Sequence, residues 1–109
     1  MKPKTLLIAA AVAALPMAVI AQDNAAAVKD ALMKADHKMM MEMDSAPMTG
    51  DADKDFVAMM IPHHQGAIDM AKVELQYGKD EKLRAMAQAI VEAQEKEIAE
   101  MKAWQAAHP

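Results

Sequence analysis

Tyr77-Gly78-Lys79-Asp80 is the stretch that decides the fold of this 109-residue chain. Glycine stops the helix that precedes it, and a new helical pattern begins at about Asp80. A connection this short makes the two flanking helices antiparallel neighbours. We therefore predict a helical hairpin, whose first helix spans about residues 51–77 and whose second spans about residues 80–107.

The segment before the hairpin predicts a third helix. Residues 22–43 carry a helical pattern with Asp23 or Asn24 as the cap, and residues 44–51 collect turn formers and form a loop. Either Asp51 or Asp53 then caps the first helix of the hairpin. The expected domains are therefore an N-terminal helix and loop at 22–50 and a hairpin domain at 51–109.

The last helix shows which face it should bury. Its apolar side chains recur at helical spacing, at Leu83, Met86, Ile90, Ala93, Met101 and Trp104. A hairpin cannot bury both of its faces alone, so the N-terminal helix, a second subunit or both should complete a bundle. We predict an all-α fold that a homodimer completes, because the core of one small chain is limited.

Residues 1–21 are typical of a cleaved export signal. Lys2 and Lys4 form a basic start, residues 6–20 are apolar, and small side chains precede Gln22. The rival interpretation is a membrane anchor, but the apolar run is shorter than the roughly 20 residues that cross a bilayer, and Pro16 interrupts it. We predict a periplasmic or secreted product that leaves the membrane after cleavage.

Composition argues against several classes of partner and of enzyme. The net charge is −4, and it becomes more negative once the signal lysines leave, so nucleic acid is not an expected partner. There is no cysteine, and the only serine, Ser45, lies in the loop without a nearby base. No histidine follows a glutamate by three residues, as a di-iron bundle requires. We expect a binding protein and no catalysis.

Methionine is the unusual component, because the chain has 13 Met but only one each of Phe, Tyr and Trp. The densest cluster joins thioethers to imidazoles within a few helical turns. Thioether sulfur is a soft, neutral donor that suits Cu(I), and imidazole binds Cu(I), Cu(II) and Zn. We predict a copper site with Cu(I) favoured and Cu(II) or Ag(I) as alternatives, and its candidate ligands are Met59, Met60, His63, His64 and Met70.

Further candidates lie around this cluster. The last helix adds Met86 and Met101, while Glu97 either orients a histidine through a hydrogen bond or stays exposed at the edge of the stripe. Pro62 either kinks its helix at Ile61 or begins it afresh. The fresh start would place both imidazoles in a first turn, where the helix dipole favours their neutral form.

Plainer interpretations accompany these candidates, because methionine at helical spacing also fills cores. The cluster at 37–43, with His37, Met40 and Met41, is either an exposed copper-gathering patch or the apolar face of a bundle helix. His108 adjoins the C-terminus and is expected to lack a fixed position. The alternative function is a Met-lined module that grips apolar segments of other proteins. Such a module tolerates Gln at both histidines of the motif, whereas a copper site does not.

The sequence resembles the DUF305 family, small exported helical proteins that include periplasmic copper-binding members. The resemblance covers about residues 51–105 and leaves the N-terminal helix outside. It runs through Asp53, Phe56, Met60-Ile61-Pro62-His63-His64-Gln65-Gly66-Ala67, Met70, Gln94, Glu97-Ile98 and Met101. It implies a ferritin-like bundle and a role in copper buffering, trafficking or tolerance. Relatives often have an acid where Ala58 stands, so any role of that carboxylate is absent here.

These observations combine into one hypothesis about the site. Met60, His63 and Met70 supply the inner ligands, and Met101 or His64 completes them from the hairpin partner or a second subunit. Met59 and Met86 are weaker candidates, because packing alone explains them. The expected partners are copper ions, a second copy of the chain and other copper-handling proteins of the envelope.

Overall fold

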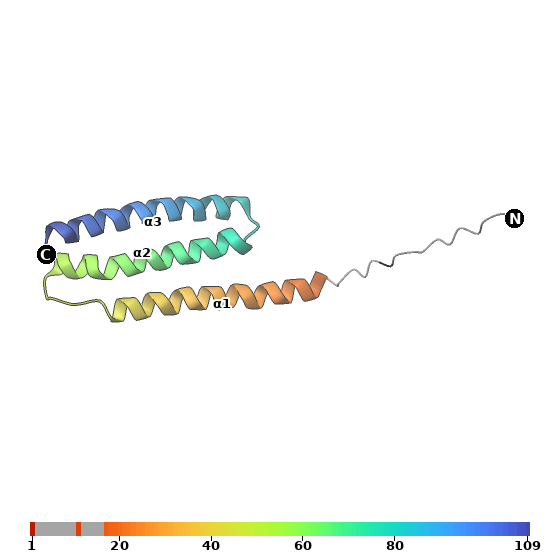
Figure 1. Cartoon of the computed structure of the whole chain (residues 1–109), viewed down its shortest axis with the longest axis horizontal. Helices are drawn as coiled ribbons and strands as arrows, with labels where there is room; N and C mark the ends of the chain where they lie inside the picture. Colours follow the sequence, from red (N-terminus) through yellow and green to blue (C-terminus); the bar gives the residue numbers. More distant parts are fainter. Residues whose placement is uncertain (2–10, 12–16) are drawn as a thin grey trace.

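The computed structural model describes residues 17–109, with side chains from Asn24 onward, besides the isolated Met1 and Ala11. It contains α1 (Met17–Asp44), α2 (Ala52–Tyr77) and α3 (Glu81–Ala107) (Figure 1). The predicted all-α fold is confirmed, but α1 runs through Asp23 and Asn24, so neither caps it. Most of the predicted signal lies outside the described residues. Within the described part of the chain, no helix is long and apolar enough to cross a membrane.

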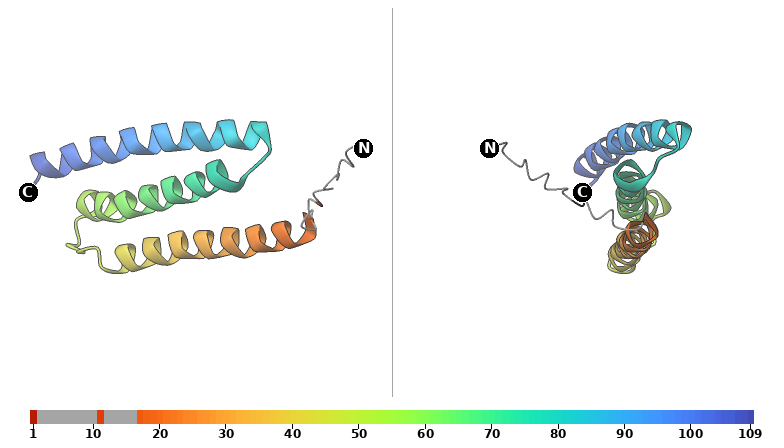
Figure 2. Two further views of the ribbon diagram at one scale, coloured as in Figure 1. Left: turned by 45° about the vertical axis from the view of Figure 1, so that its right-hand side comes forward. Right: turned by 90° about the vertical axis from the view of Figure 1, so that its right-hand side faces the viewer.

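The three helices lie side by side in one row with α2 in the middle. α2 packs against both neighbours, whereas no Cα atoms of α1 and α3 lie within 8 Å of each other among the described residues. The views in Figures 1 and 2 show the same order, with α2 antiparallel to α1 and to α3. The predicted hairpin is therefore confirmed. Because the row does not close on itself, both of its broad faces remain uncovered.

The core lies between α2 and α3 and is built from small and β-branched side chains. Ile68 is only 1% exposed, and it packs with Ala71, Ala87, Val91 and Ile98. The predicted stripe of α3 was partly wrong, because Leu83 and Met86 are 50% and 51% exposed. Alanine and valine face α2 since they let two helices approach closely. Ile90 and Met101 of the stripe pack against this core, whereas Leu83 and Met86 are left on an open face.

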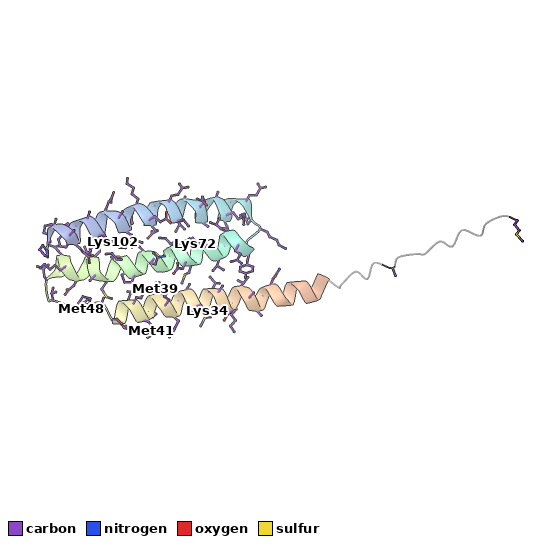
Figure 3. The ribbon with its side chains drawn as sticks, viewed as in Figure 1. Lys34, Met39, Met41, Met48, Lys72 and Lys102 are labelled. Carbon is purple, nitrogen blue, oxygen red and sulfur yellow. The ribbon has the colours of Figure 1, made fainter. Side chains whose placement is uncertain are left out.

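Contact between α1 and α2 depends on Gly66. A Cβ atom at this position would lie 2.4 Å from Met39 Sδ and 2.9 Å from Met39 Cβ, so only glycine accommodates Met39 without a shift. Figure 3 shows Met39 between the two helices. The antiparallel register set by this contact places Val28 and Leu32 beside Val73 and Tyr77, which line one hollow with them.

Pro62 lies inside α2, which continues unbroken from residue 52 to residue 77. The predicted fresh start at Pro62 is therefore wrong. The Pro62 ring is buried, and proline deprives the carbonyl of Ala58 of its helical donor. Both imidazoles consequently sit in mid-helix, so the dipole of a first turn cannot be what keeps them neutral.

Gly78 ends α2 as predicted, but for a different reason than a left-handed cap. Its φ is −68°, which any residue adopts, whereas a Cβ here would lie 2.5 Å from the Glu74 carbonyl oxygen. Arg84 Nη1 donates to the carbonyls of Leu75 and Gly78 at 2.6 and 3.1 Å and so satisfies the end of the helix. Asp80 caps α3 by accepting from the Leu83 N–H.

The loop between α1 and α2 is held by two carboxylates. Asp51 caps α2, as predicted, by accepting from the N–H groups of Asp53 and Lys54. Asp55 accepts from the Thr49 N–H at 2.8 Å, the Thr49 hydroxyl and the Gly50 N–H. The Thr49 backbone N–H is the main cause that lowers the pKa of Asp55 below its usual 3.8.

Gly66→Ala tests the seating of α1 on α2. Overpacking costs about 1–3 kcal/mol and should exceed the gain of about 1 kcal/mol that alanine brings to a helix. We expect a lower free energy of unfolding in urea, and a smaller loss when Met39→Ala makes room in the same chain. A stabilised Gly66→Ala protein would show that Met39 does not sit on Gly66.

Asp55→Asn tests the loop through its dependence on pH. Because the folded-state pKa of Asp55 lies below 3.8, its carboxylate stabilises the fold at neutral pH, and this contribution disappears as the pH falls through that folded pKa. We expect a lower Tm for the variant at pH 7 and a difference that shrinks below pH 3.8. Asp53→Asn, which changes a side chain without these bonds, is the control.

Candidate metal centre

The two consecutive histidines of α2 diverge. Neighbouring helical residues point about 100° apart, and the ring centroids of His63 and His64 are 6.3 Å apart. The His64 side chain is only 15% exposed and points to α3, while His63 is exposed to solvent. Only His64 is therefore enclosed between two helices.

His64 is held by Glu97 of α3. Its Nε2 lies 2.5 Å from Glu97 Oε2, which confirms the contact that the sequence left open. A carboxylate only accepts hydrogen bonds, so in the neutral imidazole Nε2 carries the proton and Nδ1 carries the lone pair. That Nδ1 is buried and has no hydrogen-bond partner among the described residues. An oriented, unused lone pair of this kind is what a metal-binding histidine presents.

A groove of about 630 Å³ lies along the α2–α3 seam beside this pair. Met101 brings a thioether to it, and His64 brings the imidazole. The remaining lining consists of apolar side chains and carboxylates, namely Asp53, Phe56, Val57, Glu97, Glu100 and Trp104. Met60 lies one helical turn before His64 and is half-buried. The groove itself therefore offers a soft cation one nitrogen and one sulfur, because Met60 is not among the residues that line it.

The other predicted ligands lie elsewhere. Met70 lines a separate hollow of about 250 Å³ between α1 and α2, together with Leu32 and Tyr77. Met59 is half-buried, whereas Met86 is half-exposed near the opposite end of α3. The structure thus brings His64 and Met101 together and separates Met70 from them. Among residues 24–109 no three His, Asp or Glu side chains converge, so a site built here needs thioethers.

The methionines of α1 lie nearer the motif than the sequence indicated. Because Met39 packs on Gly66, the antiparallel register brings Met43 level with Pro62 and Met40 level with Gln65. Met40 is exposed and Met43 is half-buried. Sequence reasoning missed this contact, although a glycine in mid-helix is a signal of close approach by another element.

His108 has a fixed position, so the expectation of a disordered end was wrong. Its ring stacks on Trp104 with centroids 4.1 Å apart, and its Nδ1 donates to the Trp104 carbonyl at 2.7 Å. Lys54 Nζ reaches the Pro109 carbonyl at 3.2 Å. An indole one turn away gives the terminal imidazole a surface to pack on, and Trp104 itself lines the groove.

Comparison with known proteins gives one result. A family model described as "Domain of unknown function (DUF305)" matches residues 8–105. The match includes α1, which the resemblance seen in the sequence had left outside. No curated protein matches the chain.

The His64–Glu97 pair predicts one tautomer of one histidine. At a pH where the imidazole is neutral, nitrogen NMR should show His64 protonated at Nε2, because the carboxylate accepts from that atom. Glu97→Ala should weaken this preference while leaving the exposed His63 unchanged. An Nδ1-protonated His64 in the unaltered protein would contradict the geometry.

Proposed function

We propose that this chain, which belongs to the DUF305 family, binds a copper ion in the groove between α2 and α3 and buffers or passes on the metal. The observation that carries the proposal is the buried Nδ1 of His64, whose lone pair is directed by Glu97 and otherwise unused. Met101 supplies the thioether in the same groove. Met60 is placed to add a second sulfur from the turn before His64.

The donor set favours Cu(I). Thioethers are soft and neutral, and they bind Cu(I) or Ag(I) better than hard cations. Structural zinc usually takes Cys, His and carboxylate ligands, and no three such side chains converge within residues 24–109. Methionine also needs no deprotonation and forms no disulfide, which suits an oxidising compartment. The signal-like residues 1–21 support a periplasmic or secreted location.

The proposal revises the ligand set expected from sequence. His64 replaces His63 as the principal nitrogen ligand, and Met101 replaces Met70 as the principal sulfur ligand. His63 and Met59 could serve a second, weaker locus with Met43 on the α1 side. Met70 lies eleven residues from Met59 along α2, about 16 Å away, and lines a different hollow. The open groove allows exchange of copper with other copper-handling proteins of the envelope.

We also propose that dimerisation closes the row into a ferritin-like bundle. A single chain buries only a small core, and large apolar side chains stay exposed, among them Phe56 and Met86. That exposure equally favours the second candidate function, a Met-lined module that grips apolar partners. Replacement of the histidines separates the two, since only the metal site depends on them.

Anaerobic competition titration with a chromophoric Cu(I) chelator tests the copper proposal. We expect a Kd tighter than about 1 µM, with affinity reduced at least about tenfold by His64→Gln and by Glu97→Ala, since loss of a ligand's orienting partner costs about 10–100-fold. His63→Gln is the matched control and should change little.

Two results would overturn this assignment. Unchanged affinity after both histidines become Gln would remove copper from the motif and favour the Met-lined module. Loss of binding with His37→Gln and Met40→Leu, but not with His64→Gln, would move the site to α1.

A further inference from the structure

Large apolar side chains stay exposed on all three helices. They are Leu32, Met33, Met40 and Met41 of α1, Phe56 of α2, and Leu83 and Met86 of α3. Monomeric proteins rarely leave a broad apolar patch uncovered, so such a patch marks an interaction site. The question is whether these residues share one face of the row.

The opposite broad face is identified by its own groove. Lys38 and Glu42 of α1, Gln65 of α2 and Lys102 of α3 line a groove of about 570 Å³ there, together with apolar residues such as Ala58 and Pro62. Side chains two residues apart on a helix point about 160–200° away from each other. Met40 therefore lies opposite both Lys38 and Glu42. Figure 3 also labels Lys72 and Lys102 on α2 and α3.

The same reasoning from residue spacing applies to α2 and α3. Phe56 lies nine residues before Gln65, and Met86 lies sixteen residues before Lys102, and both offsets place the side chains on opposite sides of their helices. Phe56 also lines the His64–Met101 groove. We call this surface the methionine face and define it by Met33, Met40, Phe56, Leu83 and Met86. It carries the candidate metal groove.

We propose that a second copy of the chain packs its methionine face against the first, with α1 of each copy over α3 of the other, so that Met40 of the partner completes the metal groove. The contribution of Met40 to metal binding rests on the proposed function. The pairing of the two faces does not.

Size supports a second copy as the occupant. A helix of 26 residues is about 39 Å long, and three helices at about 10 Å spacing give a face larger than the roughly 800 Å² per partner that a stable interface needs. An isologous pairing buries the methionine faces of both chains at once. It also closes a row that leaves its central helix uncovered.

Charge selects α1 as the element that covers α3. The groove side of α3 carries Glu97 and Glu100, so pairing α3 with its own copy would bring like charges together. Met40 lies at nearly the same height along the helices as His64. Its neighbour Met39 packs on Gly66, which is two residues from His64, the residue that Glu97 bonds. A twofold axis parallel to the helices leaves every residue at the same height along the helix direction. It therefore brings Met40 of the partner over the groove.

The metal groove is incomplete in one chain. It offers the His64 nitrogen and the Met101 sulfur on one side, while the opposite side is open. A soft thioether arriving from a covering helix would close the coordination of Cu(I) and exclude water. Met40 of the partner has the required chemistry, and it is exposed in the single chain.

Cysteine cross-linking tests the pairing without copper. The chain has no cysteine, so a disulfide that forms in a mixture of Met40→Cys and Ala93→Cys chains can only join two copies. We expect a covalent dimer in the mixture and little in either variant alone. A Lys38→Cys and Lys102→Cys mixture, on the opposite face, is the control. No cross-link, equal cross-linking of the control pair, or preferential linkage of Met40→Cys to itself would overturn the arrangement.

A charge introduced on the methionine face tests the proposed pairing and the proposed metal binding as separate outcomes. Met86→Glu should convert the dimer into a monomer in sedimentation while keeping its helical circular dichroism, and should weaken Cu(I) binding at least about tenfold. Lys102→Glu should do neither. A Met86→Glu monomer with unchanged copper affinity would overturn the contribution of Met40. Dimers of the unaltered chain that bind no copper would overturn the proposed function and leave the pairing intact.

Discussion

Small side chains on both sides of α2 let its neighbours approach closely, and the remaining geometry follows from that approach. Ala71 and Ala87 lie in the core between α2 and α3, while Gly66 receives Met39 of α1. Helices that meet over such residues have one preferred register, because the next bulky side chain blocks a shift. The α2–α3 register brings His64 opposite Glu97. The α1–α2 register brings the methionines of α1 alongside the motif.

Much of the backbone could be predicted from the sequence. The hairpin, the Asp51 cap and the end of α2 at Gly78 follow from local rules that involve a few neighbouring residues. The buried face of α3 followed only in part. Ile90 and Met101 do pack against the core, but hydrophobicity also selected Leu83, whereas close packing selects small side chains such as Ala87. Pro62 misled for a related reason: a buried proline is tolerated in mid-helix where tertiary packing holds the helix together.

The candidate site was predictable in its chemistry but not in its partners. Periodicity placed thioethers and imidazoles on one helix, and it identified Glu97 as an acid that needed a donor. It could not tell which histidine faces α3, since that depends on the rotation of α2 in the row. His64 is enclosed because Ile68, one turn later, is the most buried side chain of the core. Met70 was assigned to the site by periodicity, but it faces α1.

The open row joins stability to function. A chain that buries so little surface gains from any ligand or partner that binds only the folded state, and the proposed copper ion and second copy would both bind at the methionine face. Glu97 fixes the His64 imidazole in the chain without metal, so a nitrogen ligand at this position would need little reorganisation, and only the thioethers would have to adjust. Methionine is suited to that task, because its unbranched side chain adapts at low cost. The rigid nitrogen comes from within the chain, and the adaptable sulfur can come from either copy.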